Sequence, residues 1–286
     1  MLLIIDISLD FKEEYFSRTN LFEHRNVRKL SPKNYHDTVQ TFLSTGYQIR
    51  SNKRGEKVNM LIFGTSTGAS TSPKFRNEQG NHAMLPRPVL HSKPTEKGAI
   101  LMSKPWFKNL TAVLEQLTIS HVKNQTDNKA IMKTINFVKS NIHSTLRICD
   151  SCFTQMVILW SPNEEADSLN TSGMKEHIDI DDCLTCILTL GDVEYGGNTN
   201  YYNGITKSGF MKSTGSLIKT VPFEHGQVQI GNYRDIVHGV SPWVGQRITF
   251  NFHIQISVVN HFIQYGNNAY ENYRKLKFPP NFLYNV

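Results

Sequence analysis

A dense run of short strand-like segments over residues 153–256 is the feature that most constrains the fold. Eight segments rich in β-branched and aromatic residues follow one another there, separated by glycines and polar clusters. They are Phe153–Trp160, Ile178–Ile180, Leu184–Leu190, Tyr195–Tyr202, Ser216–Val221, Gln227–Ile230, Ile236–Val240 and Gln246–Ile256. So many short strands in so short a stretch predict a β-sandwich or a barrel.

Two amphipathic helices are expected immediately before this block. Apolar residues recur at spacings of three and four over Pro105–Val122 and over Asp127–Ser144, with Asp127 as the N-cap of the second helix. Helices followed by a block of strands predict an α+β protein whose helices pack on one face of a sheet. Further upstream the patterns predict strands at Leu2–Ile7 and Val58–Phe63, a helix beginning at Ser31, and a long loop over residues 64–100.

The charge of the chain is unevenly distributed. The formal net charge is +7, yet residues 161–200 hold nine acidic residues and one basic residue, which leaves 30 bases and 15 acids elsewhere. A basic protein of this kind suits a polyanionic partner, although a solvated basic surface explains the charge equally well. Apolar runs such as Leu2–Ile5 and Met60–Phe63 have only four residues and the start of the chain lacks a basic signal region, so we expect no membrane span and an intracellular protein, nuclear or cytoplasmic.

The four cysteines form two Cys-x-x-Cys pairs, which is a spacing found in zinc ribbons. The pairs are Cys149 with Cys152 and Cys183 with Cys186. The second pair lies in an expected strand, where residues three apart face opposite sides and cannot both reach one ion. Buried free thiols are therefore the first interpretation, and a zinc-ribbon module that binds nucleic acid is kept as a non-enzyme alternative.

A candidate metal site comes from two short motifs. His177 and Asp179 are two positions apart, so on a strand an imidazole and a carboxylate would project from the same face. A third ligand must come from elsewhere in the chain, and His238 is the candidate. Two histidines and one carboxylate on one side of an iron leave further positions open for a bidentate co-substrate and O₂.

A candidate anion site follows His238 along the chain. Arg247 begins the apolar run of the last expected strand, and Thr249 would face the same way as Arg247. A guanidinium and a hydroxyl in that arrangement can hold a carboxylate through charge-assisted hydrogen bonds. An arginine at such a position is expected to be paired.

These five residues together resemble the Fe(II)/2-oxoglutarate-dependent dioxygenase family. The family pattern is His-x-Asp, a distal His and Arg-x-Ser/Thr, which here is met by His177, Asp179, His238, Arg247 and Thr249. Flanking segments agree with the family in the same order, and the resemblance covers about residues 153–256. These segments are Leu188–Gly197, Val221–Gly231 and His238–Arg247.

The resemblance implies a fold, a chemistry and a division of the chain. The fold would be a double-stranded β-helix, a cupin-like jelly roll, over residues 151–260. Residues 1–150 would form a supporting N-terminal region with helices, and residues 261–286 a C-terminal extension. Fe(II) would be the catalytic metal, 2-oxoglutarate and O₂ the co-substrates, and ascorbate a candidate reductant; the reaction would be hydroxylation of a C–H bond.

Three substrate classes are left open by the sequence. The helical N-terminal half and the basic charge are similar to the Tet/J-binding-protein branch, which favours a methylated base in DNA or RNA as the first choice. Basic residues at Arg50, Lys53, Arg54 and Lys57 could line such a site or could be plain surface. The interval from His238 to Arg247 resembles prolyl-hydroxylase-like relatives equally well, which would favour a protein side chain, and a small molecule is the third class.

Several neighbouring residues receive weaker assignments. Asn198, Asn200, Tyr201 and Tyr202 follow the Gly-Gly turn and are candidate pocket residues, with a turn and packing aromatics as the equal alternative. Three other histidines are interpreted as structural, and two acidic residues after Asp179 as partners of ligands or loops. These are His225, His253 and His261, and Asp181 and Asp182.

Overall fold

The computed structural model describes residues 50–51, 57–67, 88–90, 101–124, 129–160, 173–179, 182–207, 210–234 and 236–265. The strand expected at Leu2–Ile7, the helix expected from Ser31 and the N-cap expected at Asp127 lie outside these residues. The chain divides into two compact units that interleave along the sequence. We call them the β unit (Met1–Leu61, Val157–Ile180 and Thr185–Asn251) and the helical unit (Ile62–Met156, Asp181–Leu184 and Phe252–Val286). The division expected near residues 150 and 260 stays a prediction.

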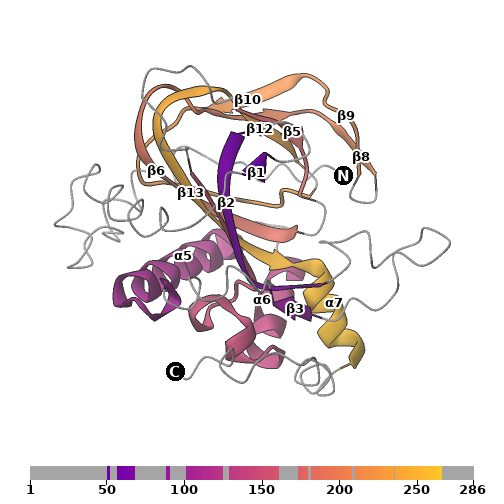
Figure 1. The fold of residues 1–286 in the computed structure, drawn as a ribbon. Helices are drawn as coiled ribbons and strands as arrows, with labels where there is room; N and C mark the ends of the chain where they lie inside the picture. Colours follow the sequence, from indigo (N-terminus) through magenta and orange to yellow (C-terminus); the bar gives the residue numbers. More distant parts are fainter. Residues whose placement is uncertain are drawn as a thin grey trace. The chain divides into compact units, whose positions relative to one another are not determined.

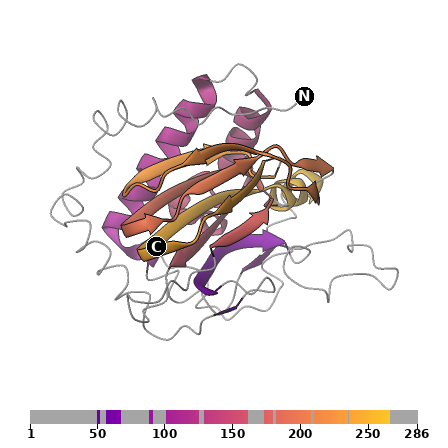
Figure 2. The same cartoon turned by 90° about the horizontal axis from the view of Figure 1, so that it is seen from above.

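Two antiparallel sheets organise the strands (Figure 1). The smaller has the order β10-β7-β12-β5, and its strands are β5 (Met174–His177), β7 (Thr199–Tyr202), β10 (Leu217–Val221) and β12 (Val237–Val240). The larger has the order β1-β2-β4-β13-β6-β11, with β3 paired to β2 (Figure 2). Its strands are β1 (Arg50–Ser51), β2 (Lys57–Thr67), β3 (Pro88–Leu90), β4 (Gln155–Trp160), β6 (Asp182–Gly196), β11 (Gln227–Gly231) and β13 (Trp243–Gln255).

The chain alternates between the two sheets from β4 to β7 and again from β10 to β13. Strands β4, β6, β11 and β13 belong to the larger sheet, whereas β5, β7, β10 and β12 belong to the smaller one. Several neighbouring strands, such as β12 with β5 and β13 with β4, are therefore far apart in sequence, which is the connectivity of a jelly roll. The predicted α+β class with a double-stranded β-helix core is confirmed. A short hairpin, β8 (Ile205–Lys207) with β9 (Phe210–Ser213), is an addition that the sequence patterns did not predict.

Some strand boundaries differ from the expected ones for clear reasons. The strand expected at Ile178–Ile180 is wrong, because β5 ends at His177. The strand expected over Tyr195–Tyr202 is broken at Gly196 and Gly197, which have φ of +77° and +69°. Gly196 also lies so close to the chain at Pro242 that a Cβ would sit 1.9 Å from its carbonyl oxygen. Only glycine combines that conformation with so close an approach.

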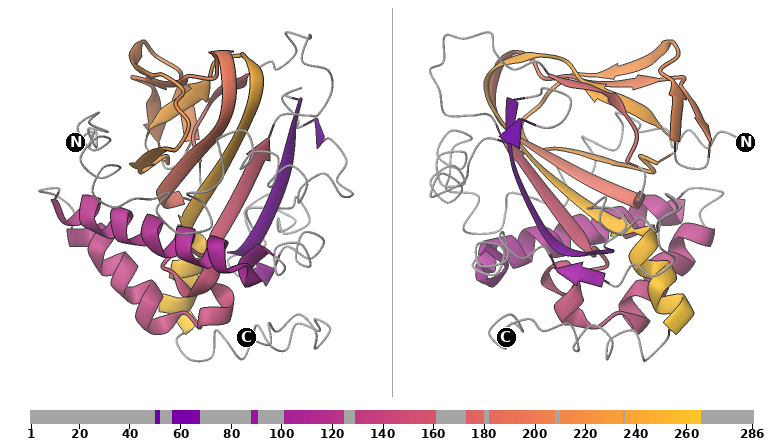
Figure 3. Two further views of the ribbon diagram at one scale, coloured as in Figure 1. Left: turned by 90° about the vertical axis from the view of Figure 1, so that its left-hand side faces the viewer. Right: turned by 45° about the vertical axis from the view of Figure 1, so that its right-hand side comes forward.

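The helical unit holds helices α5 (Pro105–Asn124), α6 (Lys129–Asn141) and α7 (Ile256–Tyr265), and α6 packs against both others (Figure 3). The two predicted helices are confirmed, whereas α7 was missed because the last strand pattern leads straight into it. Phe107 stacks on Phe252 with ring centroids 6.1 Å apart, and Phe153 lies 5.2 Å from the same ring. Each such buried side chain contributes about 1.5–3 kcal/mol to folding. No helix in the described part of the chain has the length and apolar character needed to cross a membrane.

Candidate metal centre

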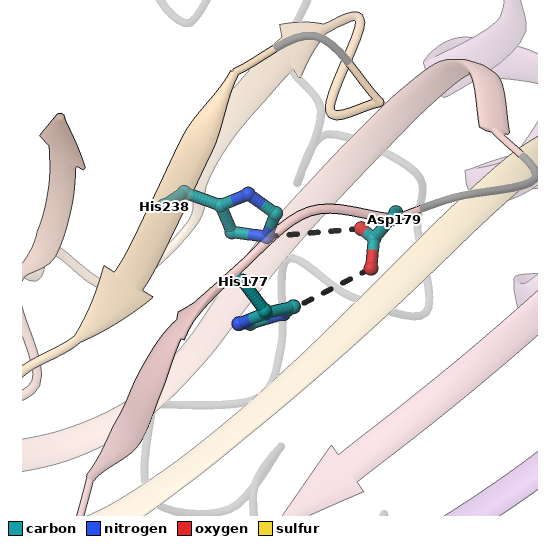
Figure 4. Close-up of side chains that lie close together, drawn as sticks. All are labelled: His177, Asp179 and His238. Carbon is teal, nitrogen blue, oxygen red and sulfur yellow. Dashed lines mark ion pairs between the residues drawn. The ribbon is translucent and has the colours of Figure 1, made fainter. Parts of the chain in front are cut away.

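Two strands of the smaller sheet bring the predicted histidines together (Figure 4). His177 is the last residue of β5, and His238 on β12 is its direct partner in the antiparallel register. Directly opposed residues project from the same face of a sheet, so the two rings come together with centroids 4.3 Å apart. The two histidines are sixty-one positions apart in the sequence, and the pairing of β5 with β12 brings them together.

The main chain, rather than a strand, positions Asp179. This residue lies two positions beyond the end of β5, so the expectation that it shares a strand face with His177 is wrong. Its N–H donates to the carbonyl oxygen of Tyr233 at 3.0 Å, which fixes the loop next to β12. The carboxylate turns back toward both imidazoles and completes the cluster in Figure 4.

Hydrogen bonds set the tautomer of both imidazoles. The Nδ1 of His177 lies 2.7 Å from the carbonyl oxygen of Lys175, and the Nδ1 of His238 lies 3.0 Å from that of Ile236. A carbonyl can only accept, so each Nδ1 carries the proton and each Nε2 offers a lone pair. Those Nε2 atoms face the carboxylate of Asp179 at 3.8 and 3.7 Å, one toward each oxygen.

The donor set fits a divalent transition metal. The ligand atoms of His177, Asp179 and His238 lie within 4.8 Å of one another. Metal bonds of about 2.0–2.2 Å place adjacent donors about 3 Å apart, so only a small inward movement is needed to grip an ion. Two imidazoles and one carboxylate on one side form the arrangement found in non-haem iron oxygenases. Metal-bound histidines usually donate their other ring N–H to such an acceptor, as both Nδ1–H groups do here.

Arg247 and Thr249 lie on the same face of β13 and are both buried, with 4% and 2% of their surface exposed. The Cζ atom of Arg247 lies 5.3 Å from the centre of the Trp243 ring, and that ring packs with residues of both sheets within the β unit. Burial lowers the pKa of the Arg247 guanidinium to about 10, so it stays charged at neutral pH. The Oγ1 of Thr249 is buried and has no hydrogen-bond partner among the described residues. A buried cation beside an unsatisfied hydroxyl suits a carboxylate ligand.

A polar network that the sequence did not reveal lies between the two sheets. The hydroxyl of Tyr201 donates to Gln229 at 2.5 Å and lies 2.7 Å from the hydroxyl of Tyr233. Gln229 in turn donates to Gln227 at 2.8 Å and to Thr199 at 3.3 Å. The alternation of glutamine with valine and isoleucine in β11 is typical of a strand with one solvated face. All five residues of β11 are nevertheless buried.

The candidate pocket residues after the Gly-Gly turn divide between the two interpretations. Tyr201 points into the β unit, opposite His238 in the register. Asn198 accepts the N–H of Phe223 through its side chain, and its own N–H donates to Ser241, so it secures the turn. Asn200 accepts a hydrogen bond from Thr220 on the neighbouring strand. Tyr201 is thus the one of these three that faces the same interior as the histidines.

The remaining predicted groups lie away from the cluster. His225 bonds to the backbone of Gly191 in a turn, as a structural histidine would. All four cysteines are free, and among the described residues they join no group of three or more possible metal ligands. Asp181, residues 161–172 of the acidic stretch and the side chains of the basic cluster from Arg50 to Lys57 lie outside the described residues.

Similarity to known proteins is found among solved structures. No protein-family model matches the chain, and no curated protein matches it. Among solved structures, NgTET1 in complex with 5mC DNA has 12% identity and a TM-score of 0.45, with 79% of this chain and 68% of that chain covered.

Two further solved structures are similar at the same level. A 2OG-Fe(II) oxygenase family oxidoreductase from Burkholderia pseudomallei has 9% identity and a TM-score of 0.39, with 76% of each chain covered. A prolyl hydroxylase from Trichoplax adhaerens, in complex with a hypoxia inducible factor peptide, has 13% identity and a TM-score of 0.38, with 77% of this chain and 76% of that chain covered. Because these TM-scores lie below 0.5, the function rests on the residues of this chain.

Proposed function

We propose that the protein is an Fe(II)- and 2-oxoglutarate-dependent oxygenase that hydroxylates a C–H bond. The observation that carries the proposal is the cluster of His177, Asp179 and His238. Both Nε2 atoms there face one carboxylate, in an arrangement that suits a divalent cation.

Each residue of the site has a definite task. His177, Asp179 and His238 hold the iron from one side and leave the other side open for the co-substrates. Arg247 and Thr249 hold the far carboxylate of 2-oxoglutarate, the first through its buried charge and the second through its unsatisfied Oγ1. The bound iron supplies the activation of O₂, and the buried surroundings exclude bulk water.

The first choice of substrate is a methylated base in DNA or RNA. Support comes from the net charge of +7 and a pI near 9.1, which suit a phosphate backbone. A protein side chain, as in prolyl hydroxylases, and a small molecule are the competing outcomes of the substrate test below.

The co-substrate reaction tests the activity without a known substrate. Purified protein with Fe(II), ascorbate and 2-oxoglutarate should form succinate slowly, and Asp179→Ala and His238→Ala should abolish this formation. Asp192→Ala is the matched control because Asp192 is an exposed carboxylate on β6 that lies outside the cluster. Succinate formation that survives in Asp179→Ala, or that needs no iron, would contradict the proposal.

Mass spectrometry decides the substrate class. Pools of methylated DNA, methylated RNA and peptides are incubated with enzyme, iron, ascorbate and 2-oxoglutarate, and each is searched for the gain of one oxygen. A gain confined to a nucleic-acid pool supports the first choice, whereas a gain confined to peptides replaces it with a protein hydroxylase. His177→Ala protein provides the blank for adventitious oxidation by free iron.

A further inference from the structure

The polar network beside the metal centre assigns a task to Tyr233. We propose that Tyr233 positions Asp179 and His238 for the metal, and that a one-way chain of hydrogen bonds through Tyr201 and Gln229 holds Tyr233 in place. The inference deepens the proposed function and rests on it, because it concerns the geometry of the same ligands. Tyr233 is a positioning residue and does not itself bind the metal.

Tyr233 contacts two of the three ligands in two different ways. Its carbonyl oxygen accepts the N–H of Asp179 at 3.0 Å, which fixes the loop that carries the carboxylate. Its ring meets the imidazole of His238 edge-on, with centroids 4.6 Å apart and planes at 86°. The residue is fully buried, and its ring also packs against Gly231, where an added Cβ would lie 3.2 Å from it. A shift of this one side chain would therefore disturb both ligands.

The direction of each hydrogen bond in the network can be worked out from Gln227, the residue farthest from the metal centre. Gln227 donates its amide to the carbonyl oxygen of Pro222 at 3.2 Å, so its own oxygen is left to accept from Gln229. Gln229 then presents its oxygen to Tyr201, whose single proton is used in that bond. The hydroxyl bond between the two tyrosines must consequently run from Tyr233 to Tyr201.

This order of donors and acceptors fixes the orientation of the Tyr233 hydroxyl. Among the described residues its proton is donated to Tyr201, and the position of Tyr201 is fixed by Gln229 of the opposite sheet. The network thus ties the loop of Asp179 and the ring of His238 to strand β11, which none of the three ligands belongs to.

Binding of Co(II) tests the proposal without turnover. Co(II) is titrated into metal-free protein and followed by its visible absorption, at a temperature where circular dichroism shows every variant folded. Tyr233→Phe and Tyr201→Phe should each weaken Co(II) binding by about tenfold and alter the visible bands, as loss of a partner beyond the ligands typically does. Tyr202→Phe is the matched control, because Tyr202 is the next residue of β7 and faces the other way. Its affinity should stay within about twofold of the wild type.

The double variant separates positioning from general loosening. If both tyrosines act through one bond, Tyr201→Phe combined with Tyr233→Phe should bind Co(II) as Tyr233→Phe alone does. If the losses of Co(II) affinity in the two single variants multiply in the double variant, the two tyrosines act independently and the proposed chain of hydrogen bonds is wrong. If Tyr233→Phe binds Co(II) with wild-type affinity, the positioning role is wrong. A different outcome is that wild-type protein binds Co(II), His177→Ala does not, and the iron-loaded wild type forms no succinate. That outcome would refute the oxygenase activity and leave the positioning role standing.

Discussion

Replacing Arg247 by methionine should make the ligand-free protein more stable. The same change should remove the stabilisation that 2-oxoglutarate gives to the wild-type protein. The change keeps the length of the side chain and removes its charge. Burial lowers the pKa of the guanidinium from its ordinary value to about 10. Each pKa unit corresponds to about 1.4 kcal/mol, so keeping this charge inside the folded protein costs about 3 kcal/mol.

The sign follows from the two protonation equilibria. Below pH 10 the arginine is charged in both the folded and the unfolded protein, so the full cost is present at pH 7. The cost disappears only as the pH rises above about 10 toward the ordinary pKa of arginine, because the folded protein releases its proton first. Methionine loses the contact of the guanidinium with the Trp243 ring, worth about 0.5–1 kcal/mol or more. We expect Arg247→Met to raise the free energy of unfolding by about 1–2 kcal/mol at pH 7.

Urea unfolding, followed by circular dichroism with Co(II) present, measures both effects. Wild-type protein should gain about 2.7 kcal/mol from 2-oxoglutarate at one hundred times its Kd, whereas Arg247→Met should gain almost nothing. Arg234→Met is the control for loss of a charge from a partly exposed position, and should keep the full gain. The reasoning is refuted if Arg247→Met lowers the stability of the ligand-free protein and 2-oxoglutarate still stabilises it as it does the wild type.

Three further predictions concern a thiol and a turn. Burial raises the pKa of Cys149 from 9.0 to about 11, so iodoacetamide should modify this thiol about 100-fold more slowly at pH 8 than in urea-unfolded protein, as peptide mass spectrometry would show. The same shift means that the folded protein holds its proton more tightly, so stability should fall between pH 9 and 11, and urea titrations should show a shallower fall in Cys149→Ala. Gly196→Ala should lower the free energy of unfolding by about 2 kcal/mol or more, because its Cβ would meet the carbonyl oxygen of Pro242 at φ +77°. Gly197→Ala should cost less, since its Cβ would have 3.4 Å of room, and equal losses would contradict this account.

The sequence predicted the triad but gave the wrong reason for part of it. His177 and His238 do face each other from paired strands. Asp179 was expected on the strand of His177, yet it lies in the loop beyond β5 and depends on the carbonyl oxygen of Tyr233. No local pattern reports such a contact, because it joins residues 54 positions apart through a backbone atom. Spacing thus identified the candidate ligands, and tertiary structure alone explains how the third of these residues is held.

Alternation along the strands was the signal most open to misreading. In β11 the glutamines Gln227 and Gln229 alternate with apolar residues, and in β13 Arg247 and Thr249 do the same. Such alternation is typical of a strand with one face in water. Here the polar positions are buried, because a second sheet covers the face that carries them, as the bond between Tyr201 and Gln229 shows.

Buried polar side chains must be satisfied by partners, and the two strands satisfy theirs differently. The glutamines of β11 bond to one another and to Tyr201, which makes them a fixed support. Thr249 of β13 keeps a buried hydroxyl without a partner among the described residues. The glutamines of β11 therefore support the proposed site through hydrogen bonds that lie within the protein. Thr249 instead keeps its Oγ1 available, and this is where 2-oxoglutarate is proposed to bind.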